Sequence, residues 1–158
     1  MDTFRELLAH LEARGEMRHV GRSVDPRFEL TAVMRKMQKG PNQALMFDNV
    51  AGSPMPVVTN VFGFRSAVAA ALDLDEASLL PALVEKENKI LPVAEADVAP
   101  VQEVVISGNE IDVARDVPQI VFSELDGGAY ITAGVLIARH PKTGVYNASW
   151  TRAELVGG

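Results

Sequence analysis

The spacing of apolar residues changes along the chain from a helical repeat to a strand-like one. Between Phe4 and Leu11 the apolar side chains recur every three or four residues, which predicts a helix. Asp2 or Thr3 can cap the start of this helix, and Gly15 can end it. An apolar stripe of this kind usually packs into a core, so we expect a structural helix rather than one that binds a partner.

Helices and short strands are predicted for the rest of the N-terminal half. Asp25 and Pro26 suit an N-cap followed by proline at the first helical position, and this helix is expected to run to about Lys39, before Gly40. The other expected elements are strands at Ala44–Phe47 and Pro56–Asn60 and helices at Ser66–Leu72 and Asp75–Asn88.

A linker is expected at Pro92–Pro100, where alanines, valines and acids alternate between two prolines. Beyond it, Val101–Ser107 alternates polar and apolar residues, Gly108 and Asn109 suit a turn, and Ile111–Val113 can return. The sequence therefore predicts a tight hairpin at this position.

A second, longer hairpin dominates the C-terminal part of the chain. Tyr130–Arg139 is rich in β-forming residues and nearly continuous in apolar character, which is typical of a strand buried on both faces. His140–Gly144 contains the proline and glycine of a turn, and Val145–Arg152 is expected to return as the second strand. Gly127 and Gly128 precede the hairpin, and both a simple turn and a ligand contact stay open for them.

The return strand carries the candidate chemistry. We expect Tyr146 and Trp150 to be buried. Amide and hydroxyl groups lie between these two residues, and a hydroxyl and a guanidinium group follow Trp150. Polar groups that leave water need partners, and a bound anion or metal can supply them. The polar residues concerned are Asn147, Ser149, Thr151 and Arg152.

Composition limits the class of protein. The 158 residues are 47% hydrophobic, enough for one domain or for a small domain and part of a second. The net charge is −6 without a basic cluster, which argues against nucleic acid as a partner. Because there is no cysteine, disulfide and thiolate chemistry are excluded. Neither a signal-peptide pattern nor an apolar run of membrane-spanning length occurs, so we expect a soluble cytoplasmic protein without a membrane partner.

Stretches in the second half of the chain, at Ser123–Gly134, Arg139–Gly144 and Asn147–Arg152, resemble the central signature of the UbiD family of reversible decarboxylases. The resemblance continues upstream at Phe4–Leu8, Leu11–Met17, Val24–Pro26, Asn42–Val57 and Asn60–Gly63. Because these stretches occur in the family's order and span essentially the whole chain, the resemblance is specific. Family members continue well beyond the length of this chain, so it resembles their N-terminal portion.

The resemblance implies an α+β fold in which a small N-terminal α/β domain, residues 1–98, precedes the beginning of a split β-barrel cofactor-binding domain, residues 99–158. It also implies a prenylated-FMN-dependent carboxy-lyase that acts on an aromatic or α,β-unsaturated carboxylic acid. The strand edges of an incomplete barrel favour association, so we expect a homo-oligomer.

The same resemblance assigns roles within Asn147–Arg152. Asn147 would bind the metal and the cofactor, and Arg152 would lie near the substrate carboxylate and the cofactor as the catalytic residue. Ser149, Trp150 and Thr151 would contact the cofactor, largely through their backbone. An amide oxygen suits Mn²⁺ or Mg²⁺ that bridges to a flavin phosphate, with K⁺ as a further candidate. A guanidinium group matches a carboxylate or a phosphate.

Strand alternation constrains this assignment. On a regular strand Asn147, Ser149 and Thr151 share one face, whereas Trp150 and Arg152 share the other. If Asn147 and Arg152 serve one ligand, the strand must end, bend or bulge between Ser149 and Arg152.

The resemblance leaves the site incomplete. In the family the acid–base Glu and the other metal ligands, a His and a Glu, come from later sequence, and none of His10, His19 or His140 matches them. Glu124 and Glu154 do not match the catalytic Glu either. We therefore expect this segment alone to be inactive and to bind flavin weakly or not at all. Two alternatives stay open: a non-catalytic binding or assembly subunit that completes a site with a partner chain, and a flavin-reductase-type split barrel that binds ordinary FMN.

Overall fold

The computed structural model describes residues 1, 3–89 and 97–156. It divides into two compact units whose segments alternate along the chain. Unit 1 consists of Met1–His19, Met37–Met46 and Val58–Ile111, and unit 2 of Val20–Lys36, Phe47–Val57 and Asp112–Gly158. The division into domains 1–98 and 99–158 stays a prediction. The predicted linker Pro92–Pro100 begins outside the described residues.

Helix α1, Phe4–Ala13, begins unit 1 with a capping box. Thr3 Oγ1 accepts a hydrogen bond from the Glu6 N–H at 3.2 Å, and Glu6 Oε2 accepts one from the Thr3 N–H at 3.3 Å. This reciprocal pair satisfies backbone donors that a helix start otherwise leaves free. Gly15 adopts φ +68° directly after the C-cap Arg14. Both predicted limits of the first helix, with Thr3 as the cap, are confirmed.

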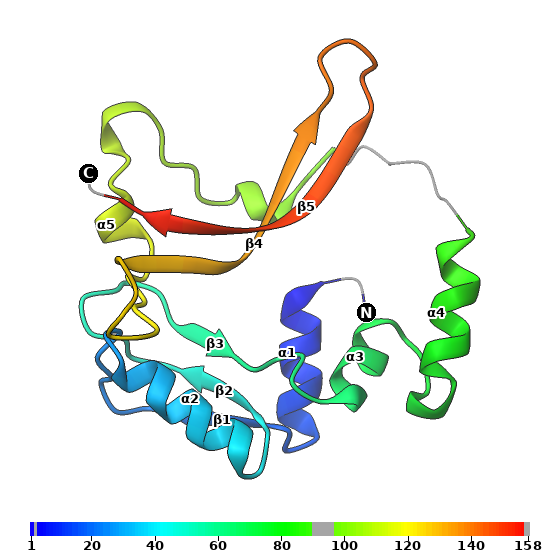
Figure 1. Ribbon diagram of the computed structural model, residues 1–158, viewed down its shortest axis with the longest axis horizontal. Helices are drawn as coiled ribbons and strands as arrows, with labels where there is room; N and C mark the ends of the chain where they lie inside the picture. The colour runs from blue at the N-terminus through cyan, green and yellow to red at the C-terminus, as the bar shows by residue number, and fades with distance from the viewer. Residues whose placement is uncertain (2, 90–96, 157–158) are drawn as a thin grey trace. The chain divides into compact units, whose positions relative to one another are not determined.

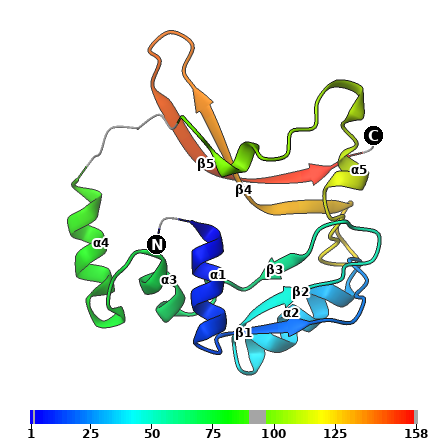
Figure 2. The same cartoon turned by 180° about the vertical axis from the view of Figure 1, so that it is seen from behind.

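The helices between residues 65 and 87 of unit 1 lie close to their predicted positions. They are α3 at Arg65–Ala71, the 3₁₀ helix η1 at Glu76–Ser78 and α4 at Leu79–Glu87. Helices α1 and α3 lie side by side and are in contact (Figures 1 and 2). The core cluster of the unit consists of Leu7, Leu11, Met17, Ala44, Val61 and Ala67.

A three-stranded sheet has the order β1-β2-β3. Strands β2, Ala44–Phe47, and β3, Val57–Thr59, confirm the predicted neighbouring strands. Strand β1, Met17–Val20, was not predicted, because only Met17 is buried and Val20 is half-buried in a segment of four residues. So short an apolar pattern carries little periodic signal.

Helix α2, Glu29–Lys39, begins later than the predicted start at Pro26. Phe28 has φ +68°, a left-handed conformation that cannot continue a right-handed helix, so the helix starts after it. Asp25 Oδ1 instead accepts a hydrogen bond from the Arg27 N–H at 2.7 Å, the contact of an Asx turn. The prediction of an N-cap at Asp25 with proline at the first helical position is therefore wrong.

In unit 2, the segment before the long hairpin is joined to the start of α2. The Phe28 N–H donates to Val121 O at 3.1 Å, and the Val121 N–H donates to Pro26 O at 3.2 Å. Thr31 Oγ1 lies 3.0 Å from Phe28 O and 3.2 Å from Phe122 O. Since Thr31 is only 2% exposed, its hydroxyl is a buried link between segments that are distant in sequence.

The predicted hairpin at Val101–Val113 is wrong. This segment instead forms the 3₁₀ helices η2, Pro100–Gln102, and η3, Gly108–Glu110, and the start of the short helix α5, Val113–Asp116. The valines and isoleucines in it that suggested strands are exposed, so no buried sheet face selects a strand there.

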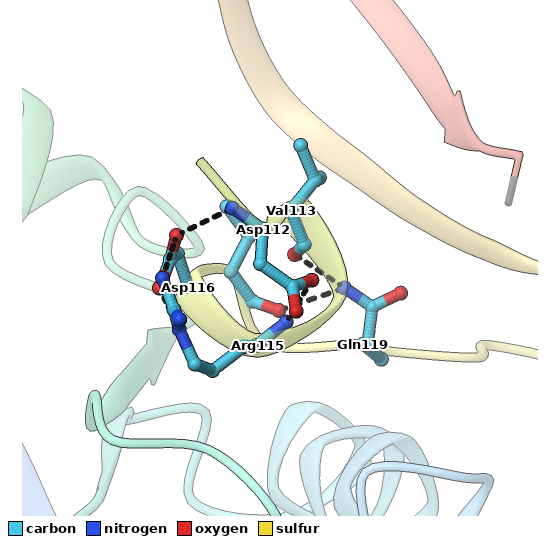
Figure 3. Close-up of polar contacts among 6 residues, drawn as sticks. Asp112, Val113, Arg115, Asp116 and Gln119 are labelled. Atoms are coloured by element: carbon cyan, nitrogen blue, oxygen red, sulfur yellow. Dashed lines mark hydrogen bonds and ion pairs between the residues drawn. The ribbon is translucent and has the colours of Figure 1, made fainter. Parts of the chain in front are cut away.

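Local polar contacts hold α5 (Figure 3). Asp112 Oδ1 caps the helix by accepting from the Arg115 N–H at 3.1 Å, and Arg115 Nε lies 2.6 Å from Asp116 Oδ1. The Gln119 amide donates to Val113 O and Val117 O at 3.1 and 2.8 Å. The Asp116 carboxylate raises the pKa of Arg115, and in turn the hydrogen bond from Arg115 lowers the pKa of Asp116.

The long hairpin is confirmed as the antiparallel pair of β4, Ala129–Arg139, and β5, Tyr146–Leu155. Both strands change direction part-way along their length (Figures 1 and 2). The combination of helices and small sheets makes the fold α+β, as predicted. No helix among the described residues is long and apolar enough to cross a membrane.

Candidate functional site

Register places the predicted polar residues of β5 on one face of the hairpin. Directly opposed residues of an antiparallel pair lie on the same face. The pairs on this face are Asn147 with Ala138, Ser149 with Leu136, and Thr151 with Gly134. We call it the amide face. It carries polar groups, small residues and the exposed Leu136, all of them on or near the surface.

Contacts within the amide face bring two of the predicted residues together. The hydroxyl oxygens of Ser149 and Thr151 lie 3.4 Å apart. Opposite them, a Cβ added at Gly134 would lie 3.1 Å from Thr151 O, so glycine permits a close approach of the two backbones. Among the described residues, no hydrogen bond is made by the Asn147 amide group. The face therefore offers an exposed amide beside two hydroxyl groups.

The opposite face of the hairpin is apolar, and its exposure corrects two predictions. Its pairs are Val135 with Trp150, Ile137 with Ala148, and Arg139 with Tyr146. Trp150 is 85% exposed and Tyr146 58%, so the expectation that both are buried is wrong. The expectation that Tyr130–Arg139 is buried on both faces is also wrong, since Val135, Leu136 and Ile137 are exposed. The sheet here has two strands, and the described residues form no second layer that covers them.

Arg152 lies at an irregularity of the ladder. Ile131 pairs with Ala153 and Gly134 pairs with Thr151, so Thr132 and Ala133 together lie opposite Arg152. A two-against-one arrangement is a bulge, which bends a strand pair and redirects side chains. The extra residue belongs to β4, while β5 continues to Leu155.

A break in the alternation of β5 was predicted between Ser149 and Arg152. The bulge lies opposite Arg152, but its extra residue is on β4. No hydrogen bond of the Arg152 guanidinium occurs among the described residues. The convergence of Asn147 and Arg152 on one ligand stays a prediction.

The turn of the hairpin is held by its own residues. His140 Nδ1 accepts hydrogen bonds from the N–H groups of Lys142 and Thr143 at 3.3 and 3.1 Å. Arg139 Nε donates to Gly144 O at 3.2 Å, and its guanidinium lies 5.6 Å from the centre of the Tyr146 ring. His140 therefore stabilises the turn.

Sequence reasoning did not select Tyr130 and Glu154, which face each other across the hairpin. Burial raises the pKa of Tyr130, and the charge of Glu154 and a hydrogen bond to its carboxylate raise it further, whereas Arg152 lowers it. Glu154 Oε1 also lies where a side chain at Gly127 would be, 2.8 Å from an added Cβ. Pairing the two predicted strands could not have found this pair, because the predicted return strand ended at Arg152 and a regular register would place Tyr130 opposite Leu155.

Two open grooves lie elsewhere. One, of about 430 Å³, is lined by residues of unit 1 that include Glu16 and Phe64. The other, of about 300 Å³, is lined by residues of unit 2 that include Phe28 and Arg35. Neither groove is lined by Asn147 or Arg152.

The described residues hold no group of three or more His, Cys, Asp or Glu side chains that could bind a metal. The amide face nonetheless has the right donors for one side of a metal and phosphate site. It offers an oxygen ligand of the type that Mn²⁺ and Mg²⁺ accept, and hydroxyl groups that can donate to a phosphate. Further ligands would have to come from outside these residues.

Comparison with known proteins identifies the family. The model of the 3-octaprenyl-4-hydroxybenzoate carboxy-lyase N-terminal domain matches residues 8–87, and that of the Rift-related domain of the same carboxy-lyase matches residues 92–158. The chain belongs to the UbiD family, as its motifs indicated.

Solved structures of this class have the same fold as the chain. The UbiD-class enzyme HmfF from Pelotomaculum thermopropionicum, solved with FMN, is 37% identical with a TM-score of 0.86, over 94% of this chain and 33% of that chain. Vanillic acid decarboxylase from Sedimentibacter hydroxybenzoicus is 28% identical with a TM-score of 0.85, over 97% and 34%. A Rhodospirillum rubrum protein encoded in the cooM 5′ region is 35% identical, over 96% of this chain and 33% of its own length. The chain thus spans about a third of the length of these relatives.

Proposed function

We propose that this chain forms the N-terminal part of a UbiD-class carboxy-lyase that uses prenylated FMN to decarboxylate, reversibly, an aromatic or α,β-unsaturated carboxylic acid. The observation that carries the proposal is the amide face beside the bulge at Arg152, with an amide and a guanidinium that make no hydrogen bond to described residues. Structures of HmfF with FMN and with prenylated FMN support a flavin as the cofactor.

The residue types define the proposed roles. Asn147 Oδ1 would bind a divalent ion, Mn²⁺ or Mg²⁺, that neutralises a flavin phosphate, with K⁺ as a second candidate ion. Ser149, Trp150 and Thr151 would border the cofactor, since they lie between Asn147 and Arg152 on β5. The Arg152 guanidinium would hold the substrate carboxylate through paired hydrogen bonds. The flavin, when bound, supplies the electron-accepting centre of the reaction.

The segment itself is proposed to be inactive, because its described residues contain no complete metal set. A carboxylic acid or similar group must deliver a proton after CO₂ leaves, and no side chain of the described hairpin is assigned to this step. We further propose a cytoplasmic homo-oligomer whose cofactor-binding domain is a split β-barrel, begun at residues 99–158. The exposed apolar face of the hairpin supports association, because large apolar surfaces of this kind are usually covered.

The first experiment compares the 158-residue chain with its native form. The chain is incubated with prenylated FMN, Mn²⁺ and a panel of aromatic and unsaturated acids, and CO₂ release is measured. We expect none from the chain alone and release from the protein purified from its own cells. Turnover by the isolated chain would overturn the proposal that the site is incomplete.

Variants of the native form test the residue assignments. Asn147→Ala and Arg152→Gln should each lower flavin retention or turnover, whereas Lys142→Gln in the exposed turn should not. Full retention and turnover in both variants would contradict the roles given to β5.

The alternative function, a non-catalytic subunit that completes a site with a partner chain, is also compatible with the exposed apolar face. The intact mass of the native protein distinguishes the two. A mass of 17.0 kDa would favour the short subunit, and a larger mass would favour a longer enzyme.

A further inference from the structure

The bulge at Arg152 is bordered on both sides by contacts that depend on glycine. On one side, Gly134 approaches Thr151 O so closely that an added Cβ would lie 3.1 Å from it. On the other side, Glu154 lies against Gly127, where an added Cβ would lie 2.8 Å from Oε1. The second contact leaves no room for a side chain at position 127 unless the carboxylate moves.

Tyr130 joins this second contact to β4. It pairs with Glu154 in the ladder, and its hydroxyl would lie 3.8 Å from a Cβ at Gly127. A tyrosine hydroxyl beside a carboxylate can donate to it, and a hydrogen bond of this kind contributes to the raised pKa of Tyr130. The carboxylate therefore contacts the glycine loop and the opposing strand at the same time.

Charge extends the group to Arg152. By strand alternation Glu154, two residues beyond Arg152, lies on the same face of β5. The Arg152 guanidinium lowers the pKa of the Tyr130 hydroxyl, which agrees with its place on the face of β5 that carries Glu154. The negative charge of the Glu154 carboxylate attracts the Arg152 guanidinium and favours its orientation towards Tyr130 and Glu154.

We propose that Glu154 is a positioning residue for Arg152: its carboxylate holds the Tyr130 hydroxyl and the Gly127–Gly128 loop against β5, and so fixes the bend at which Arg152 lies. The inference rests on the proposed function, in which Arg152 binds the carboxylate of the substrate. It also gives the glycines before the hairpin a packing role, one of the two interpretations that the sequence left open.

The test uses the ¹⁵N-labelled 158-residue chain and NMR. Two quantities are measured: hydrogen exchange at the backbone amides of Tyr130, which donates to Ile120 O at 3.0 Å, and of Ala153, and the Nε–Hε signal of Arg152. In Glu154→Ala the amides should exchange about tenfold faster, since a charged hydrogen bond is lost, and the Arg152 signal should shift. Tyr130→Phe should also speed exchange, because it removes the donor.

The conservative variant separates positioning from a purely structural role. Glu154→Gln keeps a hydrogen-bond acceptor, so exchange should stay within about threefold of the original, but it removes the charge, so the Arg152 signal should still shift. Glu124→Gln, an exposed acid before the loop, is the control and should change neither quantity.

An unchanged Arg152 signal in Glu154→Gln and Tyr130→Phe would overturn the inference, even if Glu154→Ala failed to fold. An equal shift in Glu124→Gln would overturn it too. No flavin is present in these measurements. If the native protein did not bind flavin, the proposed function would be refuted but the positioning role of Glu154 would not. If the NMR quantities did not change, the positioning role would be refuted but the proposed function would not.

Discussion

Replacing Thr31 by valine removes one buried hydroxyl and almost nothing else. The Thr31 hydroxyl lies 3.0 Å from Phe28 O and 3.2 Å from Phe122 O. Without it, Phe28 O keeps the Ala32 N–H at 2.8 Å, but among the described residues Phe122 O keeps only Arg35 Nη2 at 3.5 Å. The variant therefore leaves a carbonyl poorly paired, and we expect a loss of about 1.5 kcal/mol in the free energy of unfolding.

Thr31→Ser is the matched control because it keeps the hydroxyl and removes one methyl group, worth about 0.8 kcal/mol. Urea denaturation followed by circular dichroism at 222 nm measures both variants. Trp150 fluorescence is unsuitable, because that ring is already 85% exposed in the folded chain. With a slope of about 1.5 kcal/mol per M urea, the midpoint of Thr31→Val should fall by about 1 M. If Thr31→Val were as stable as Thr31→Ser, the assigned role of the hydroxyl would be refuted.

The remaining predictions concern unit 1 and the start of α2. Leu11 is 0% exposed, so Leu11→Ala should lower the free energy of unfolding by about 3 kcal/mol in the same assay, and a loss below about 1 kcal/mol would contradict its place in the core. The Asp25 N–H and then Arg22 hold the pKa of Glu29 below 4.5, so its contribution to stability is present above that pH and is lost as the pH falls. Glu29→Gln should therefore lose less stability than the original chain between pH 7 and pH 3; equal losses would refute this.

Local patterns predicted most elements of unit 1. The capping residue Thr3, the apolar repeat from Phe4 to Leu11 and Gly15 all act within one helix, so the sequence alone contains the necessary information. Strands β2 and β3 were found for the same reason. The start of α2 was missed because the left-handed conformation of Phe28 accompanies hydrogen bonds to Val121, far away in the chain.

The hairpin shows how much of a functional site can be predicted from the sequence. Motif order selected Asn147–Arg152, and strand alternation required a break in regularity close to Arg152 if both residues serve one ligand, which stays a prediction. Sequence could not show that the break lies on β4, since register depends on both strands. Nor could it show the exposure of Trp150, because an apolar pattern reports what can be buried and not which layer covers it.

The central claim is that Asn147 and Arg152 serve one flavin site. A crystal structure of the native protein, prepared with prenylated FMN and Mn²⁺, tests it directly. We predict that Asn147 Oδ1 coordinates a metal ion that also binds the flavin phosphate. The Arg152 guanidinium should contact the same flavin molecule and lie within hydrogen-bond distance of the substrate-binding position. A structure with the two side chains on opposite faces of β5, and only one or neither at the flavin, would contradict the account.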